Sequence, residues 1–156
     1  MNFPNFIFSF FKFLLLFLNN MENCIFCKIA KKEIPCFEVF ENEKFLAFLD
    51  IKPRNPGHTL VIPKEHFRWV WDVPYLGEYF EVVGKVANAI KKAMNTDFVV
   101  SFIIGEEVPH AHIHLVPRFP GDNHGALIDL SIVHKIEEKE MEKIAKKISS
   151  CIKLDS

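Results

Sequence analysis

The stretch VPHAHIHLVPR, residues 108–118, places a histidine at every second position of an otherwise apolar run. Three of the chain's seven histidines fall within it. Successive side chains of a β-strand point to opposite faces, so His110, His112 and His114 would share one face and the apolar residues between them the other. The stretch therefore predicts a strand with an apolar side packed on a core and an imidazole side that faces a site.

Three kinds of chemistry fit such a row of histidines. Neutral imidazoles on one strand face can converge on a metal ion. Each ring can instead be held structurally by backbone groups, or one ring can act as a nucleophile while its neighbours orient it and stabilise charge. The row by itself favours a metal site.

The pattern around the row indicates an α+β fold built on an antiparallel sheet. Short β-prone runs predict strands at 37–42, 44–50, 58–63 and 98–104, with the histidine run as a further strand. Apolar residues at helical spacing predict helices at 24–32, from Pro74 onward and at 134–152. The expected apolar stripes are Phe80, Val83, Val86, Ala87, Ile90, Ala93 and Met94 on the long helix, and Met141, Ile144, Ala145, Ile148 and Ile152 on the last.

Length, charge and cysteine content narrow the class of protein. The chain has 156 residues, enough for one domain, and 19 basic residues against 20 acidic ones give a formal net charge of -1. We therefore expect no nucleic acid as a partner, because binding to a phosphate backbone needs a basic surface. Four cysteines are too few for a disulfide scaffold, and a C-x-x-C pair suits a reducing compartment, so a cytoplasmic location is expected.

The first twenty residues differ in composition from the rest. Their apolar run, Phe6 to Leu18, is interrupted by Lys12 and is shorter than the roughly 20 residues that span a bilayer. The run also lacks the basic start and small-residue cleavage site of a signal peptide. We expect residues 1–20 to be an extension outside the fold, with a domain at 21–156; a membrane-tethered protein is the alternative hypothesis.

Three segments together resemble the histidine-triad (HIT) family of nucleotide hydrolases and transferases. They are CIFCKI at 24–29, FLAFLDIKPRNPGHTLVIPKEH at 45–66, and the histidine row, which matches the family signature His-φ-His-φ-His-φ-φ with φ apolar. The resemblance runs from about residue 24 to residue 118. It implies a five-stranded antiparallel sheet with one long helix and short flanking helices, a two-fold homodimer, and a purine nucleotide as substrate.

The resemblance also implies roles for the histidines. His112 would attack the α-phosphate and form a covalent nucleotidyl-histidine, which agrees with the nucleophilicity of a neutral imidazole near pH 7. His110 and His114 would contact phosphate oxygens or the leaving group. His58, in PGHTLVIP, would lie within hydrogen-bonding reach of the nucleophile.

The nucleotide-binding residues follow from the same resemblance. Asp50 would accept hydrogen bonds from the ribose hydroxyls, although the residue by itself reads as a strand-end aspartate that caps a turn. Phe26, Phe48 and Ile51 would form an apolar slot for the base, and each would serve equally well in a core.

Zinc is the cofactor that the resemblance implies, held by Cys24, Cys27, His66 and His110. Two thiolates and two imidazoles complete a tetrahedral zinc site, and four protein ligands leave no open position, so the metal would be structural. A redox role for the C-x-x-C pair lacks the surrounding βαβ pattern. The other two cysteines, Cys36 and Cys151, are expected to be small core residues.

The chain departs from the family pattern just before the row. Members usually carry an Asn-x-Gly segment and a Gly-Gln pair there, whereas this chain has SFIIGEEVPH, with Glu106 in place of the glutamine. A carboxylate beside a phosphate is unfavourable, so one phosphate contact would be lost. The sequence thus predicts a hydrolase of nucleoside phosphoramidates or dinucleoside polyphosphates, with a catalytically weak nucleotide-binding or sensing protein of the same fold as the alternative.

Overall fold

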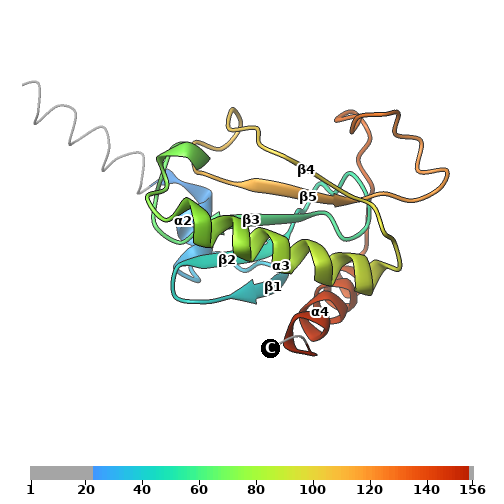
Figure 1. Ribbon diagram of the computed structural model, residues 1–156, viewed down its shortest axis with the longest axis horizontal. Helices are drawn as coiled ribbons and strands as arrows, with labels where there is room; N and C mark the ends of the chain where they lie inside the picture. The colour runs from blue at the N-terminus through green and yellow to red at the C-terminus, as the bar shows by residue number, and fades with distance from the viewer. Residues whose placement is uncertain (1–22, 155–156) are drawn as a thin grey trace, which may run out of the picture.

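The computed structural model describes residues 23–154, so the apolar extension 1–20 and the expected domain start at Met21 lie outside the described residues. The expected α+β class and five-stranded antiparallel sheet are confirmed (Figure 1). The strands are β1 (Glu38–Glu41), β2 (Phe45–Leu49), β3 (Thr59–Pro63), β4 (Val99–Phe102) and β5 (Ile113–Pro117). The helices are α2 (Ile25–Ala30), the short 3-10 helix η1 (Val70–Asp72), α3 (Leu76–Met94) and α4 (Glu138–Leu154).

The order of the strands places the last histidine of the row inside the sheet. The order is β1-β2-β3-β5-β4, and each neighbouring pair is antiparallel. His114 on β5 lies opposite Leu60 of β3 on one side and Phe102 of β4 on the other. His114 is therefore bracketed by two strands, and its side chain points out of one sheet face.

The two faces of the sheet bury different residues, as the period of two along a strand requires. Ala47, Leu49 and Val61 belong to the larger core, which also contains the buried stripes of α3 and α4. Leu46 and Leu60 face the other side and pack with α2 in a smaller core. Figure 1 shows α3 running across the sheet on the side of the larger core. The smaller core lies on the face that carries the candidate site.

The apolar side of the histidine row behaves as the alternation predicts. Ala111, Ile113 and Leu115 are each 2% exposed or less and belong to the larger core. The strand itself is shorter than expected, because β5 begins only at Ile113. Before it, the chain turns: the His110 N–H donates to the Val108 carbonyl at 2.8 Å, which is a local bond that a strand ladder would not contain.

The helices differ from the expectation at their starts and at one buried position. Helix α3 begins at Leu76 and not at Pro74, and it buries Tyr79 where Phe80 was expected; Phe80 is 44% exposed. The Tyr79 hydroxyl donates to the carbonyl of Val61, which satisfies this buried polar group. The expected apolar stripe of the last helix is confirmed, since all five of its residues are buried.

Helix α4 begins at Glu138 and not at 134. The His134 N–H donates to the carbonyl of Pro53 at 2.9 Å, so residues 134–137 connect to the helix in a non-helical conformation. Within residues 23–154, no helix combines the length and the apolar character needed to cross a membrane.

Candidate functional site

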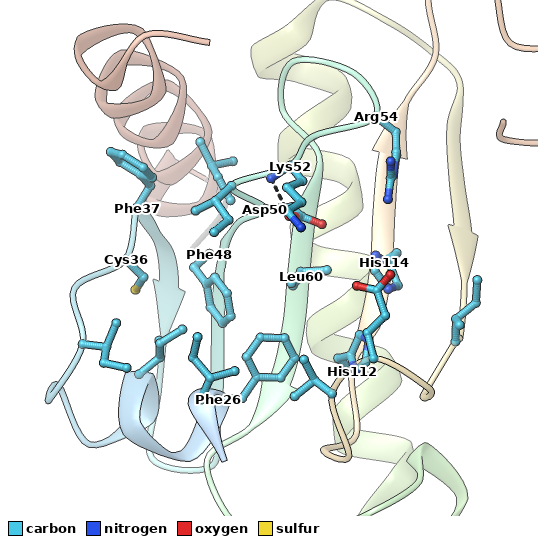
Figure 2. A pocket seen from close by; sticks show the side chains of 18 of the residues that line it. Phe26, Cys36, Phe37, Phe48, Asp50, Lys52, Arg54, Leu60, His112 and His114 are labelled. Atoms are coloured by element: carbon cyan, nitrogen blue, oxygen red, sulfur yellow. Dashed lines mark hydrogen bonds between the residues drawn. The ribbon is translucent and has the colours of Figure 1, made fainter. Parts of the chain in front are cut away.

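A cavity of about 320 Å³ opens on the sheet face that carries α2 (Figure 2). Residues from α2, from the end of β2, from β3 and from the histidine row line it. The expected site residues among them are Phe26, Phe48, Asp50, Ile51, His112 and His114. The volume fits a small organic ligand, since such pockets start at about 300 Å³.

One end of the cavity is an apolar slot. Phe26 of α2 and Phe48 of β2 meet edge to face with ring centroids 5.6 Å apart, and Leu60 of β3 lies beside them. Both phenyl rings are buried, whereas Ile51 is 76% exposed and lies at the rim. A flat aromatic ligand can pack in this slot between apolar side chains, which is how a base would be held.

His112 presents an unprotonated nitrogen to the cavity. Its Nδ1 lies 2.6 Å from the carbonyl oxygen of His110. A carbonyl only accepts, so Nδ1 carries the proton and donates, and Nε2 keeps its lone pair. Burial lowers the pKa of His112 and outweighs the opposite effect of the bond to the His110 carbonyl, which keeps the ring neutral at pH 7. A neutral ring with an exposed lone pair is the form that can act as a nucleophile.

His114 presents the opposite chemistry, because His58 fixes its tautomer. The Arg54 backbone N–H donates to His58 Nδ1 at 3.2 Å, so the proton of a neutral His58 lies on Nε2. This Nε2–H donates to His114 Nδ1 at 3.0 Å, which leaves the His114 proton on Nε2. Burial lowers the pKa of each ring to about 3, so both are neutral at pH 7. His114 therefore offers an N–H donor.

A stacked phenyl ring holds this pair of rings. Phe102 of β4 stacks on His114 with centroids 4.4 Å apart and an interplanar angle of 12°. Asp50 Oδ2 lies 3.5 Å from His58 Nδ1, but neither atom carries a proton when His58 is neutral, so the two form neither an ion pair nor a hydrogen bond. The expectation that His58 reaches the nucleophile directly is corrected: His58 bonds to His114, and His114 lies next to His112 with centroids 4.9 Å apart.

His110 belongs to a second cluster, on the far side of Phe26. Its Nδ1 lies 3.4 Å from the Cys24 sulfur and 3.5 Å from the Cys27 sulfur, and His66 Nδ1 lies 3.2 Å from Cys27. One ligand atom from each of these four buried residues lies within 4.8 Å of every other. The group is therefore a possible metal site.

The chemistry of the donors fits zinc. His110 Nε2 donates to the carbonyl of Pro63 at 2.8 Å, so its Nδ1 lone pair is available to the cluster. A hydrogen bond with Cys27 lowers the pKa of the Cys24 thiol, while the same contact raises the pKa of Cys27. The bond to Pro63 uses Nε2 of His110, and the contacts with the two cysteine sulfurs use its Nδ1. Because both nitrogens are engaged, the expectation that His110 contacts a phosphate is corrected.

Sequence reasoning missed the charged residues of the cavity rim. Lys52 and Arg54, in the turn that follows Asp50, both line the cavity. Glu107 also lines the cavity, whereas the resemblance to the HIT pattern points to Glu106 as the carboxylate beside the phosphate. The signal for the two cations was present in the segment DIKPRNPG, because they lie two and four residues after Asp50.

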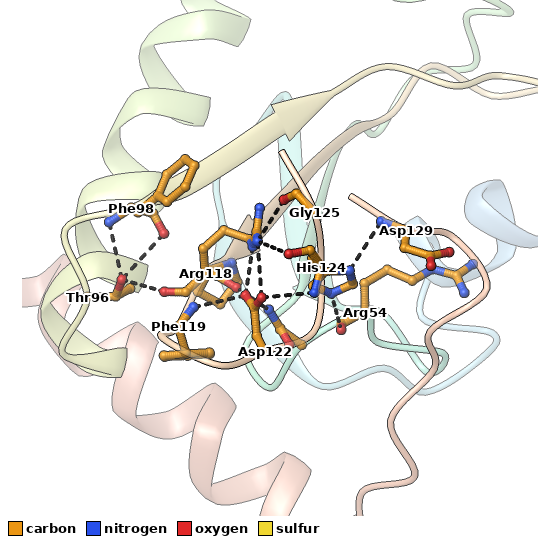
Figure 3. Close-up of polar contacts among 11 residues, drawn as sticks. Arg54, Thr96, Phe98, Arg118, Phe119, Asp122, His124, Gly125 and Asp129 are labelled. Carbon is orange, nitrogen blue, oxygen red and sulfur yellow. Dashed lines mark hydrogen bonds and ion pairs between the residues drawn. The ribbon is translucent and has the colours of Figure 1, made fainter. Parts of the chain in front are cut away.

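The segment after β5 forms a polar network that the sequence did not predict (Figure 3). Arg118 and Asp122 form a buried ion pair at 2.7 Å, and Asp122 also accepts from Asn55 at 3.0 Å. The pKa of Asp122 is lowered by its hydrogen bonds with Arg118. His124 Nε2 donates to the Arg54 carbonyl at 2.9 Å. The network therefore ties residues 118–124 to the turn that lines the cavity.

The two remaining cysteines are only partly buried. Cys36 lines the cavity beside the apolar slot, and Cys151 packs against the larger core. Cys36 also packs against the smaller core, so both cysteines lie at the edge of a core and neither is fully buried as expected.

Comparisons with known proteins agree with this geometry. The HIT domain family profile matches residues 31–121. An uncharacterized HIT-like protein of Methanocaldococcus jannaschii is 39% identical over 126 residues, which cover 77% of this chain and 96% of the relative. An adenosine 5′-monophosphoramidase of Schizosaccharomyces pombe is 36% identical over 134 residues, which cover 84% of this chain and 99% of that relative.

Solved structures show the same fold. The crystal structure of a zinc-bound histidine triad family protein from Mycobacterium smegmatis matches with a TM-score of 0.70 at 30% identity, over 86% of this chain and 97% of that one. The matched family profile, the relatives over most of their own length and the shared five-stranded architecture show that the chain belongs to the histidine-triad (HIT) family.

Proposed function

We propose that this protein is a hydrolase of purine nucleoside phosphoramidates or dinucleoside polyphosphates. It would cleave the bond between the α-phosphorus and the leaving group. The observation that carries the proposal is the pair of opposite tautomers at one cavity: a lone pair on His112 and an N–H donor on His114. They lie next to an apolar slot for a base and near the carboxylate of Asp50, which would accept hydrogen bonds from the ribose. The adenosine 5′-monophosphoramidase relative supports this substrate class.

We assign each step of the reaction to residues of the chain. His112 Nε2 attacks phosphorus and forms a covalent nucleotidyl-histidine as the bond to the leaving group breaks. The bond from His112 Nδ1 to the His110 carbonyl orients the ring and stabilises the positive charge that develops on it. His114 donates to a phosphate oxygen or to the leaving atom. Water then cleaves the bond from nitrogen to phosphorus, and the proton that this water releases balances the one gained by a leaving amine.

Turnover of adenosine 5′-monophosphoramidate tests the proposal. We expect the wild type to release AMP, and we expect His112→Ala to lose at least a thousandfold in kcat while it still binds AMP, because no other described ring at the cavity offers a free lone pair. Acid-quenched protein should carry one nucleotidyl group on the peptide that contains His112. An active His112→Ala variant, or an adduct on another residue, would refute the assignment.

A second function has one observation in its favour. Glu107, which is exposed, brings a carboxylate to the cavity, and its negative charge would repel phosphate. A nucleotide-binding or sensing protein with weak turnover would therefore bind AMP with ordinary affinity and show a kcat near the uncatalysed rate. Glu107→Gln distinguishes the two: a rise in kcat above tenfold would support the sensing function for the wild type.

We also propose that the cluster of Cys24, Cys27, His66 and His110 binds one structural zinc. Two thiolates and two imidazoles would hold the zinc, which would tie α2 to the segment that leads into β5. Protein purified without chelators should contain one zinc per chain by elemental analysis. Metal-free protein with the same melting temperature as the native protein would count against a structural role.

A homodimer is the expected assembly. In the described sheet β4 is an edge strand, and several large apolar residues around it and on α3 are exposed: Trp69, Trp71, Phe80, Phe98 and Ile104. A cluster of large exposed apolar side chains is typical of a protein interface. Light scattering coupled to size exclusion should give twice the chain mass, and Phe98→Asp should give the mass of one chain.

A further inference from the structure

Arg54 is a residue whose backbone is fixed from two sides. Its N–H donates to His58 Nδ1 at 3.2 Å, and its carbonyl accepts from His124 Nε2 at 2.9 Å. His124 Nδ1 in turn accepts the backbone N–H of Asp129 at 3.1 Å, so both nitrogens of this ring are engaged. The backbone of Arg54 is therefore held by His58, which bonds to His114, on one side and by His124 of the segment after β5 on the other.

The guanidinium of Arg54 is also held in place. Its Nη1 donates to the carbonyls of Leu130 and Ile132. Among the contacts of the described residues, both of these bonds use Nη1, which leaves Nε and Nη2 for a ligand. Figure 2 shows the guanidinium directed along the cavity wall toward His114. A cation fixed in this way loses less side-chain entropy when it binds an anion than a free lysine would.

The charge of Arg54 acts on the site. Burial and then the charge of Arg54 lower the pKa of His58; at His114 burial and the neighbouring His58 and His112 lower the pKa more than Arg54 does, but its field still reaches this ring. Lys52, two residues earlier, lines the same cavity. In the described part of the chain these two residues are the cations of the cavity lining. Arg54 is the one that lies on the His114 side.

Leaving groups differ in what they need at this position. An amine must gain a proton as its bond to phosphorus breaks, and a neutral His114 with a proton held on Nε2 is a weak acid. A phosphate or sulfate leaves with the electron pair of the broken bond on its oxygen and needs a neighbouring positive charge instead. The fixed guanidinium meets the second requirement.

We propose that Arg54 determines specificity at this site by selecting nucleoside 5′-phosphate derivatives whose leaving group carries a negative charge next to the scissile bond. The inference rests on the proposed function, which places the α-phosphate between His112 and His114. In this step His112 Nε2 bonds to phosphorus, the bond from phosphorus to the leaving oxygen breaks, and the guanidinium binds the departing anion. Water then cleaves the adduct and releases one proton to the solvent.

The test compares substrates that share adenosine and the α-phosphate. Adenosine 5′-phosphosulfate carries an anionic sulfate, a glycine-linked adenosine phosphoramidate carries a carboxylate, and adenosine 5′-monophosphoramidate carries an uncharged amine. We expect Arg54→Gln to lower the ratio of kcat/KM for the phosphosulfate over that for the monophosphoramidate by about tenfold, the effect of one hydrogen bond to a charged group. The glycine-linked substrate distinguishes a carboxylate from a sulfate as the preferred anion. Arg54→Lys, which keeps the charge but loses the planar fork, should lower the ratio less.

Lys143→Gln is the matched control. Lys143 is an exposed lysine on α4, paired with Glu140 at 3.2 Å, and its loss changes the net charge equally. This variant should keep the wild-type ratio, and melting curves should show that every variant is folded. An equal fall for all three substrates in Arg54→Gln would overturn the inference, because Arg54 would then act on the shared α-phosphate or on the fold.

Binding separates this inference from the proposed hydrolase function. ADP places a β-phosphate where a leaving group would lie, so wild type should bind ADP more tightly than AMP, and Arg54→Gln should reduce that preference about tenfold. If no substrate turned over, the hydrolase proposal would fail, and a retained ADP preference that depends on Arg54 would still support the anion subsite. Equal affinity of the wild type for ADP and AMP would refute it.

Discussion

The buried pair His58 and His114 should make the fold sensitive to mild acid. Each ring has a pKa of about 3 in the folded chain, because burial disfavours the charged form. In the unfolded chain an exposed histidine has a pKa near 6.5. Between these values the unfolded state binds more protons than the folded one, so the free energy of unfolding falls as the pH falls through 6.5 toward 3.

The size of the effect follows from the difference in protonation. At pH 7 both rings are largely neutral in the folded and in the unfolded chain. At pH 5 the pH lies about 1.5 units below the pKa of an unfolded histidine, so protonation stabilises the unfolded chain by about 2 kcal/mol per ring. The two rings share one hydrogen bond, so their contributions are not independent. We therefore expect the free energy of unfolding to drop by about 2 to 4 kcal/mol between pH 7 and pH 5.

Urea unfolding followed by tryptophan fluorescence and circular dichroism measures this drop, at a fixed protein concentration. The comparison is with His58→Gln, which removes one of the two rings and should reduce the drop by about 2 kcal/mol. Loss of metal at low pH affects both proteins and cancels in the difference. If the variant loses as much stability as the wild type between pH 7 and pH 5, the explanation based on the buried pair is wrong.

Three further perturbations have expected outcomes. Cys24→Ser should lose the metal and lower the melting temperature together, because binding free energy in such a site is also folding free energy; metal analysis and calorimetry check this. Asp122→Asn should cost about 2 kcal/mol, measured by urea unfolding, because it leaves Arg118 without its buried carboxylate partner. A chain that begins at Met21 should melt and turn over as the full chain does, and a clear loss of melting temperature would show that residues 1–20 pack on the domain.

Much of the sheet could be predicted from the sequence, because its strands are either short continuous β-prone runs or alternate between buried and site-facing residues. The runs around Phe45 and Val61 are buried on both faces, and the alternate residues of the histidine row enter the core as expected. On the long helix the sequence predicts Phe80 as the first buried residue of the apolar stripe, whereas the structure buries Tyr79. A tyrosine whose hydroxyl finds a backbone acceptor can be buried as well as a phenylalanine. Local periodicity does not show where that acceptor lies.

The part of the site that could not be predicted depends on contacts between distant segments. The position of Arg54 is set by carbonyls at Leu130 and Ile132, which are more than seventy residues later in the chain. The network around Asp122 likewise joins Asn55 to Arg118 and Asp122, which lie more than sixty residues later in the chain. Turn composition marks such regions only as loops, so their role becomes visible only in three dimensions.

The histidine row shows how the fold gives identical residues different chemistry. His110 donates from Nε2 to Pro63, so its Nδ1 faces the cysteines. His112 donates from Nδ1 to the His110 carbonyl, which leaves Nε2 free at the cavity. His114 accepts at Nδ1 from His58 and becomes a donor at Nε2. The carbonyl that orients His112 belongs to a residue of the cysteine cluster, so a metal bound there would hold the proposed nucleophile, His112, in place through a single backbone group.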